Sequence, residues 1–287
     1  MGHEEQFASR CEADVPLSTV STFGIGGPAA LLFRAKTVPD LQEAMEFAFA
    51  SKTRCLVIGR GSNCLFPDTG FPGLVIVNRL EEVREEDGGR FIAGGGARLP
   101  SLSLQTARSG WGGLEFAAGI PGSVGGAVCM NAGASGQQTG AVVESVDYID
   151  ERGALHTLSG LSFGYRSSSL RGKGGVIASV TFQLHKEEHA LDRQKEMAEY
   201  RKRTQPKERS AGCIFRNPPG LSAGRLIDEA GLKGRSIGGA QVSPVHANFI
   251  VNQGGATAAD VRALIEVVRS EVLARSGVSL DCEVICF

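Results

Sequence analysis

A glycine-flanked turn is the first segment of this sequence whose residue types and spacing suggest ligand binding. Gly59-Arg60-Gly61-Ser62-Asn63 directly follows a short apolar run. The backbone N–H groups of such a turn can curl around a phosphate or diphosphate and bind it as an anion. The segment has neither the Gly-x-Gly-x-x-Gly pattern of a Rossmann helix nor the Gly-Lys-Ser/Thr ending of a P-loop. It therefore argues against those two folds, and an ordinary tight turn is the alternative to an anion site.

A second glycine-rich stretch points to a large, flat ligand. It reads Gly119-Ile120-Pro121-Gly122-Ser123-Val124-Gly125-Gly126-Ala127 and is followed by Met130-Asn131-Ala132-Gly133-Ala134. The chain contains 39 glycines in 287 residues, roughly twice the number expected at an average usage of about 7%. Residues without side chains allow a ligand to approach the backbone closely. Two such stretches suggest one extended cofactor, and the alternative is a glycine-rich corner that packs on itself.

The order of these segments resembles a known flavoprotein family. The turn at 59–63, then Gly94-Gly95-Gly96, then the stretch at 119–134, is similar to the FAD-binding domain of UDP-N-acetylenolpyruvoylglucosamine reductases, within the vanillyl-alcohol-oxidase-like (PCMH-type) superfamily. The resemblance implies an α+β protein with an FAD-binding domain of two subdomains, residues 1–80 and 81–187, and a C-terminal α+β substrate-binding domain, residues 188–287. The FAD-binding residues that it implies are Gly59, Arg60, Gly61, Ser62, Asn63, Gly94, Gly95, Gly119, Pro121, Gly122, Ser123, Gly125, Gly126, Asn131, Ala132 and Gly133.

The resemblance covers nearly the whole chain, from residues 18–27 to the last strand. Three further motifs of the family are matched in order, by Tyr165-Arg166-Ser167-Ser168, by residues 210–218 (SAGCIFRNP) and by Cys282-Glu283-Val284. The implied activity uses NADPH to reduce FAD, and the reduced flavin then reduces the enolpyruvyl ether of UDP-N-acetylglucosamine enolpyruvate. The product is UDP-N-acetylmuramate, a precursor of peptidoglycan. At 287 residues the chain resembles the compact members, which lack an extra substrate-covering loop.

The resemblance also implies the catalytic residues. Most members have a serine as proton donor where this chain has Cys213. A thiol, with a reference pKa of about 8.5, is mostly protonated near neutrality and is a stronger acid than an alcohol. Arg166 would stabilise the enolate-like charge, because a guanidinium stays protonated and binds a carboxylate with two hydrogen bonds. Glu283 would assist the proton transfer, since a bare carboxylate in an otherwise apolar strand is costly without a role.

Each catalytic assignment has a structural alternative. Cys213 could be a small core residue, Arg166 a member of a surface salt bridge, and Glu283 a solvent-facing residue at a strand edge.

Substrate recognition would fall to four residues: Tyr165, Arg201, Arg216 and Asn217. The basic run at 201–203 is placed to meet the diphosphate of the nucleotide sugar, although such a run is often only a solvated helix face. Gln241, His246 and Asn252 match a stretch near the family's substrate site, but His246 is left out of catalysis because it could equally be a core histidine.

The elements that must position these residues alternate between helices and strands. Hydrophobic periodicity and capping residues predict helices over residues 39–52, 100–109, 222–230 and from 257 to about 277. Apolar and alternating runs predict strands over residues 54–58, 74–77, 91–93, 142–149, 154–158, 176–184 and 248–251. Residues 114–140 are too rich in glycine for regular structure and are predicted to form an ordered binding loop. The charged, helix-prone stretch at 187–209 marks the domain boundary.

The net charge, the cysteine content and the N-terminal sequence narrow the possible functions and locations further. With 30 basic and 31 acidic residues the formal net charge is −1, which favours neither nucleic-acid nor membrane binding. Residues 1–14 do not form a signal-peptide pattern, so we expect a cytosolic protein. We also expect it to act on a small-molecule substrate and to be a monomer. The seven cysteines lack a Cys-x-x-Cys pair, which argues against a disulfide framework or a four-thiolate metal site and predicts that most of them are buried, reduced thiols.

Two other functions remain open from the sequence. One is an FAD-dependent sugar or alcohol oxidase of the same superfamily, which would use oxygen in place of NADPH. Many such oxidases attach FAD through a histidine near the first glycine segment, and no histidine lies between His3 and His156. The other is a flavin- or nucleotide-binding module without catalysis, which only the replacement of serine by Cys213 supports. The presence of Arg166 and Glu283 at the expected positions argues against it.

Overall fold

The computed structural model describes residues 3–287, so Met1 and Gly2 lie outside the described part. The chain forms two compact units, each built from separate stretches of sequence. The first unit consists of residues up to Ala13, Ala30–Arg60 and Pro72–Arg201, and the second of Asp14–Ala29, Gly61–Phe71 and Lys202–Phe287. The boundaries at residues 80/81 and 187/188 that the sequence suggested stay a prediction.

A four-stranded sheet lies mainly in the first unit. Its order is β1 (Glu12–Pro16), β2 (Pro28–Ala35), β5 (Phe71–Asn78) and β3 (Cys55–Ile58), and β3 and β5 are parallel. Helix α2 (Val38–Ala50) begins with a capping box between Thr37 and Asp40, as expected for a helix N-terminus. Phe7 of α1 (His3–Ala8) packs between Phe33 and Phe47 in the core beside α2. The helix and strand predicted at 39–52 and 54–58 are confirmed.

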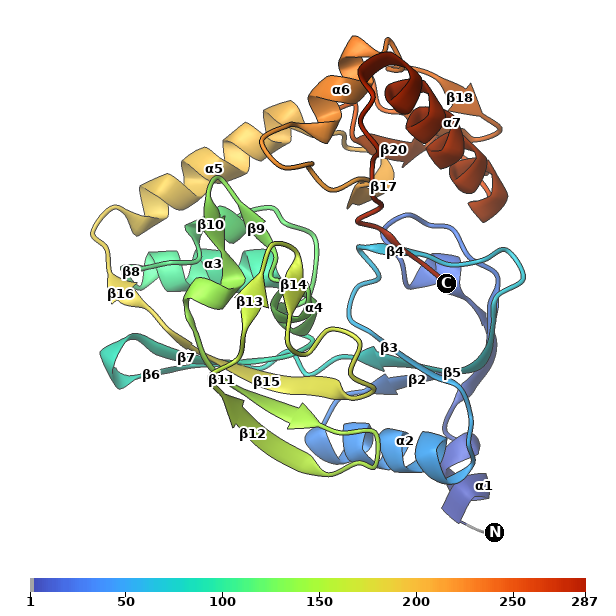
Figure 1. The fold of residues 1–287 in the computed structure, drawn as a ribbon. Coiled ribbons are helices and arrows are strands. Elements are labelled where there is room, and N and C mark those ends of the chain that lie inside the picture. Colours follow the sequence, from blue (N-terminus) through green and yellow to red (C-terminus); the bar gives the residue numbers. More distant parts are fainter. Residues whose placement is uncertain (1–2) are drawn as a thin grey trace. The chain divides into compact units, whose positions relative to one another are not determined.

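An antiparallel sheet of five strands supports the second glycine-rich stretch. Its order is β12 (Leu155–Ser159), β11 (Val143–Ile149), β15 (Val176–Gln183), β7 (Arg90–Gly94) and β6 (Val83–Glu86). Neighbouring residues of β15 enter two cores: Ile177 packs with α3 (Leu99–Arg108) and α4 (Val124–Cys129), whereas Ala178 packs with α2. In Figure 1, α3 and α4 accordingly lie on one side of this sheet and α2 lies on the other. The predicted strands at 91–93, 142–149, 154–158 and 176–184 are confirmed.

The prediction that residues 114–140 lack regular structure is wrong in part. The stretch contains the 3-10 turns η3 (Glu115–Ala117) and η4 (Thr139–Ala141), the helix α4, and the short strands β9 (Gly133–Ala134) and β10 (Gln137–Gln138). Helix α4 forms despite two glycines because Ser123 caps it, accepting a hydrogen bond from the Gly126 N–H at 3.3 Å. The N–H of Gly125 also donates to the carbonyl of Gly95 at 2.8 Å. Tertiary contacts therefore outweigh the low helix propensity of glycine.

Short elements complete the first unit. Strand β8 (Trp111–Gly112) pairs with β16 (His185–Lys186), and β13 (Phe163–Gly164) pairs with β14 (Ser167–Ser168) in a hairpin. The 3-10 turn η2 (Asp87–Gly89) connects β6 to β7. Helix α5 (Ala190–Thr204) forms within the predicted charged stretch and runs past the end of this unit at Arg201.

The second unit is built around a four-stranded antiparallel sheet. Its order is β17 (Arg209–Cys213), β20 (Phe249–Asn252), β19 (Ala240–Val242) and β18 (Ser236–Ile237). The apolar face of α7 (Ala258–Ser276) and the helix α6 (Ala223–Glu229) pack into one core with it. The turn η1 (Leu17–Thr19) also lies here, and β21 (Ile285–Cys286) pairs in parallel with β4 (Cys64–Leu65). Both C-terminal helices start and stop where the sequence predicts.

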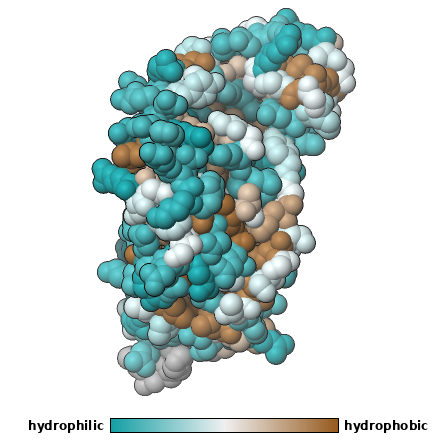
Figure 2. Space-filling model, turned by 90° about the vertical axis from the view of Figure 1, so that its left-hand side faces the viewer, coloured by the Kyte–Doolittle hydropathy of each residue, from teal (hydrophilic) through white to brown (hydrophobic). Residues whose placement is uncertain are grey.

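Polar residues dominate the face of the molecule drawn in Figure 2, and hydrophobic residues are scattered among them. Within residues 3–287, no helix is both long and apolar enough to cross a membrane. All seven cysteines are free thiols. The expectation that most of them are buried is wrong, because five are half-buried and Cys55 and Cys286 are exposed.

The N-terminus of α7 makes a pH-dependent contribution to stability. The backbone N–H of Thr257 lowers the pKa of Asp260, whose carboxylate completes the capping box. A carboxyl with a folded-state pKa below its unfolded value of about 3.9 stabilises the fold above that value, and the contribution disappears as the pH falls through the folded-state pKa. We expect Asp260→Asn to lower the urea midpoint at pH 7 and to have a smaller effect near pH 3.

The control for this experiment is Asp192→Asn on α5, because Asp192 is exposed and its ion pair with Lys195 is long, at 3.9 Å. An effect of Asp260→Asn that is equally large at both pH values would contradict the assignment.

Candidate active site

The first unit brings the two glycine-rich segments together. A methyl group added to Gly59 would overlap Ser123, the residue that caps α4. Gly125 in the first turn of α4 lies against the backbone of Gly95. At Gly126 a methyl group would meet only the Oγ of Ser123, at 3.3 Å. The predicted cofactor residues at 59, 95, 123, 125 and 126 thus form one connected cluster, in which Gly126 is exposed.

The glycines that follow β7 serve the protein's own backbone. Methyl groups at Gly94 and Gly95 would overlap the carbonyl oxygens of Leu80 and Ile177. The N–H of Gly95 donates to Ala178 at 2.7 Å, and that of Gly94 donates to Glu82 at 2.8 Å. These N–H groups are therefore already used and cannot also hold a phosphate. The structure gives these glycines a packing role, and their predicted contact with FAD would have to use other atoms.

Other predicted cofactor residues also make internal contacts. The carbonyl of Gly122 accepts a hydrogen bond from the N–H of Leu99, and the carbonyl of Ala132 accepts from Thr139. Pro121 is exposed, whereas Gly119 lies against the side chain of Arg201, with the Nε 3.5 Å from the position of an added methyl group. Arg201 and Gly119, which the sequence assigned to substrate and cofactor, are therefore neighbours in the first unit.

Arg166 lies at the turn of the β13–β14 hairpin in an unusual backbone conformation. Its φ is +53°, in the left-handed region that costs a residue with a side chain roughly 1–2 kcal/mol. Its Nη1 donates to the carbonyl of Gly133 at 3.1 Å, and its guanidinium lies 5.5 Å from the ring centre of Tyr165. Tyr165 is 56% exposed. Strain held in place by tertiary contacts is typical of functional positions, which agrees with the predicted roles.

Asn131 connects the Arg166 hairpin to the second glycine-rich stretch. Its side chain is buried and donates to the carbonyl of Gly164 at 2.8 Å and to Gln138 at 3.0 Å. Its Oδ1 accepts from the N–H of Gly140 at 2.9 Å. The sequence predicted Asn131 as a cofactor residue, and the structure shows that its amide also holds the hairpin.

Removing this amide should weaken the fold. Asn131→Ala removes three hydrogen bonds of a buried side chain, each contributing about 1 kcal/mol, so we expect it to lower the free energy of unfolding by about 2–3 kcal/mol, measured by urea denaturation. Gln137→Ala, an exposed position on β10, is the control. A change of less than about 0.5 kcal/mol, the usual range for surface substitutions, would contradict this role.

The second unit places Cys213 and Glu283 on adjacent chain segments. The N–H of Glu283 donates to the carbonyl of Ile214 at 2.7 Å, and Phe215 forms a β-bridge with Cys282. Cys213, at the end of β17, is therefore one residue from the backbone partner of Glu283. Both side chains are partly buried. The strand that the sequence suggested around Glu283 is only two residues long, at Ile285–Cys286.

Asn63, a predicted cofactor residue, belongs to the same part of the second unit. Its Nδ2 donates to the carbonyl of Glu283 at 3.1 Å. Nearby in sequence, Gly61 has a φ of +57°, and a methyl group there would meet the carbonyl oxygen of Val20 at 2.6 Å. A glycine is thus required at 61 to turn the chain, and Ser62, between these two residues, is partly buried.

The two predicted substrate residues after Cys213 are anchored by backbone contacts. The N–H of Arg216 donates to the carbonyl of Asp281 at 2.9 Å. The Oδ1 of Asn217 accepts from the N–H of Ala223, the first residue of α6, at 3.0 Å. Asn217 therefore also orders the loop that enters α6.

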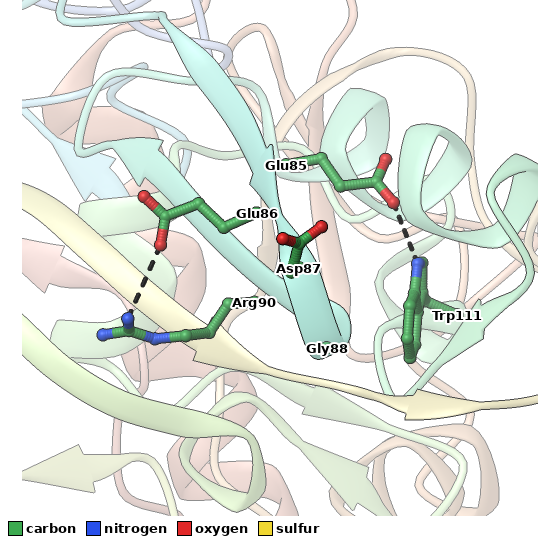
Figure 3. A pocket seen from close by; sticks show the side chains of 6 residues that line it. All are labelled: Glu85, Glu86, Asp87, Gly88, Arg90 and Trp111. Atoms are coloured by element: carbon green, nitrogen blue, oxygen red, sulfur yellow. Dashed lines mark hydrogen bonds and ion pairs between the residues drawn. The ribbon is translucent and has the colours of Figure 1, made fainter.

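A surface pocket of the first unit lies at the opposite end of β7 from Gly94. It is lined by Glu85, Glu86, Asp87, Gly88, Arg90 and Trp111 (Figure 3). Glu85 accepts from the Trp111 indole N–H at 2.9 Å, and Glu86 pairs with Arg90 at 3.5 Å. These carboxylates are held by neighbours, and none of the six residues is a predicted site residue.

Two arginines that the sequence reasoning missed accompany Arg60. Arg79 pairs with Glu81 at 3.5 Å, and the same Glu81 oxygen pairs with Arg60 at 3.1 Å. The backbone of Arg98 forms a β-bridge with Ser123. The position of Arg98, two residues after Gly96, was a signal that could have drawn attention to it.

Comparisons with known proteins cover both units. Residues 29–159 match a family described as "FAD binding domain", and residues 205–287 match "UDP-N-acetylenolpyruvoylglucosamine reductase, C-terminal domain". The chain is 48% identical to the UDP-N-acetylenolpyruvoylglucosamine reductase of Protochlamydia amoebophila, over 93% of this chain and 91% of that protein. It is 45% identical to that of Chlamydia pneumoniae, over 93% and 89%.

A solved structure is similar over the same length. The crystal structure of UDP-N-acetylenolpyruvylglucosamine reductase from Thermus caldophilus matches with a TM-score of 0.84 and 40% sequence identity. The match covers 97% of this chain and 99% of that chain. The similarity therefore extends to the fold as a whole.

Proposed function

Because this chain belongs to the UDP-N-acetylenolpyruvoylglucosamine reductase family, we propose that it performs the reaction for which that family is named. It is a flavin-dependent oxidoreductase that uses NADPH and FAD to reduce UDP-N-acetylglucosamine enolpyruvate to UDP-N-acetylmuramate. The observation that carries this conclusion is the similarity over 93% of the chain, which includes both the FAD-binding and the C-terminal match.

The residues of the first unit fit a cofactor that bears a diphosphate. The Nε of Arg60 is buried and has no hydrogen-bond partner among residues 3–287. The predicted cofactor residue Ser123, which lies against Gly59 next to Arg60, caps α4 beside an exposed Gly126. Bound FAD supplies the redox chemistry, accepting reducing equivalents from NADPH and passing them to the vinyl carbon of the substrate. The protein must bind and orient FAD and the substrate, stabilise the negative charge that develops on the substrate, and supply a proton.

Arg166 is proposed to stabilise the charge that develops on the carboxylate side of the substrate. A guanidinium stays charged and presents two parallel donors to a carboxylate. The hydrogen bond to Gly133 and the strained turn hold the group in one place before the substrate arrives, which favours electrostatic stabilisation of the transition state.

Cys213 is proposed to protonate the carbon next to that carboxylate through its Sγ–H. Glu283 is proposed to assist the transfer, by orienting the substrate or by polarising the thiol. The hydrogen bond between Glu283 and Ile214 supports this pairing because it fixes the two segments in register. Tyr165, Arg201, Arg216 and Asn217 are proposed to bind the nucleotide sugar.

The function is tested by following flavin absorbance without oxygen while NADPH and then UDP-N-acetylglucosamine enolpyruvate are added. We expect the yellow colour to bleach with NADPH and to return with the enolpyruvyl sugar. Recovery only after air is admitted would favour an oxidase. A colourless protein that cannot be loaded with FAD would overturn the proposal.

The wider biological role follows from the product. We propose that the enzyme supplies a peptidoglycan precursor, and thereby serves cell-wall synthesis, cell shape and cell division. Its location in the cytosol and its monomeric state stay predictions, which cell fractionation and light scattering would test.

A further inference from the structure

Three arginines converge on the contact between the two glycine-rich segments of the first unit. Gly59 lies directly against Ser123, and Ser123 forms a β-bridge with Arg98. Arg60 follows Gly59 in the chain. The backbone therefore places two arginines next to the same serine, Arg98 through the β-bridge and Arg60 through its neighbour Gly59, independently of how their flexible side chains are oriented.

The third arginine is tied to both of the others. Arg79 shares the carboxylate of Glu81 with Arg60. A methyl group on Gly96 would meet the Cα of Arg79 at 2.9 Å, so the segment that leads to Arg98 passes directly beside Arg79. Arg60, Arg79 and Arg98, called here the arginine cluster, thus form a closed set of neighbours within one unit.

The cluster carries more positive charge than its carboxylate partner balances. Three guanidiniums against Glu81 leave a surplus of two positive charges. Burial, together with repulsion from Arg79 and Arg98, lowers the pKa of Arg60 even though Glu81 attracts it. Repulsion of this kind between like charges is unfavourable, and an anion bound between them would relieve it. A surplus of two matches the two negative charges of a dinucleotide's diphosphate.

We propose that Arg79 and Arg98 bind the diphosphate of FAD together with Arg60 and thereby determine how tightly the cofactor is held. The inference rests on the proposed function only in taking FAD as the resident cofactor. The substrate and NADPH also carry diphosphates, but all three arginines lie within the residues that match the FAD-binding family, 29–159. Arg60 follows Gly59, and Arg98 forms a β-bridge with Ser123; the family resemblance assigned Gly59 and Ser123 to FAD. The Nε of Arg60 is buried and has no hydrogen-bond partner among the described residues, so this donor is still unsatisfied.

The test is cofactor binding to the apoprotein, without turnover. Titrations followed by flavin fluorescence compare FAD with riboflavin, which lacks the diphosphate, for the unmodified chain, Arg98→Gln and Arg79→Gln. Each substitution removes a charge-assisted contact, so we expect the Kd for FAD to rise about tenfold or more while that for riboflavin changes less than about twofold. The slope of log Kd for FAD against log salt concentration should also become shallower.

The matched control is Arg108→Gln, because Arg108 is an exposed arginine at the other end of α3 from Arg98. It should leave the Kd for FAD and its salt slope unchanged. Thermal unfolding of each apoprotein checks that the variants are folded. Arg98 makes no side-chain capping bond to α3, so its replacement should not unfold the helix.

Three outcomes would overturn the inference. Equal losses for FAD and riboflavin would assign the arginines a structural role. An unchanged Kd for FAD, with a raised Kd of the FAD-loaded protein for NADP⁺ or the nucleotide sugar, would assign them to another diphosphate. No change in any of these constants would leave the cluster without a ligand. Failure of the unmodified chain to bind FAD would instead count against the proposed function, so the two failures are distinguishable.

Discussion

The Cys213→Ala variant is expected to reduce its flavin with NADPH at nearly the normal rate and to pass those electrons to the enolpyruvyl substrate far more slowly. Removal of a general acid typically costs a factor of about 10²–10⁴. The two half-reactions are separated by anaerobic stopped-flow absorbance. The expected loss lies only in the second, because Cys213 is proposed to act on the substrate carbon and not on NADPH.

Two variants sharpen this experiment. Cys213→Ser restores the residue that most of the family carries, and it should recover most of the second half-reaction with an altered pH profile. Cys286→Ala changes an exposed thiol near the end of the chain and should leave both half-reactions intact. If Cys213→Ala turned over normally, the assignment of Cys213 as proton donor would be wrong.

The second large effect is expected at Arg166. Arg166→Lys keeps a positive charge but loses the planar pair of donors, so we expect the oxidative half-reaction to slow by about 10²–10³, the cost of removing one donor from an oxyanion site. The control is Arg152→Lys, because Arg152 lies on the exposed turn after β11 and stacks on Phe49 at 5.2 Å.

The strained backbone at Arg166 allows a separate test of whether its side chain serves activity and not stability. Glycine accepts a φ of +53° without steric cost. Arg166→Gly should therefore change the free energy of unfolding by less than about 1 kcal/mol, yet abolish measurable turnover. Normal turnover in this variant, or severe unfolding, would contradict the proposed role.

The sequence predicted those helices and turns well whose stabilising contacts all lie within a few residues of one another. The helix α7 is an example, because Thr257 and Asp260 form the expected capping box and Gly277 ends the helix at a φ of +70°. The β11–β12 hairpin is another, since the side chain of Asp150 accepts hydrogen bonds from the turn that follows it. Capping and turn chemistry act over a few residues, so the sequence alone contains them.

The helix α4 could not be predicted in that way. Its Gly125 and Gly126 disfavour a helix locally, and the stabilising contact with Gly95 is far away in sequence. The roles of individual glycines were also ambiguous. Gly94 must be a glycine because a side chain there would overlap the carbonyl oxygen of Leu80. In the sequence, such a glycine looks the same as one that leaves room for a ligand.

Charged side chains posed a similar problem. Arg60 could be assigned from the motif around it, whereas Arg79 and Arg98 belong to no motif. Arg79 joins Arg60 through Glu81 in the loop after β5, and Arg98 joins it through the β-bridge with Ser123, which lies next to Gly59. The family resemblance supplied Cys213, Arg166 and Glu283, whereas physical reasoning on the sequence alone would have left each of them with an ordinary structural explanation.

The interleaved course of the chain limits how this protein can be divided or exchanged. The chain passes between its two compact units after residues 13, 29, 60, 71 and 201. A fragment that ends at Arg201 would keep residues 14–29 and 61–71 without the core in which Phe23 and Leu65 are completely buried. Such a fragment would expose those apolar side chains and aggregate. Recombination between relatives should therefore succeed when whole genes are exchanged and fail when the breakpoint separates these stretches from the C-terminal third.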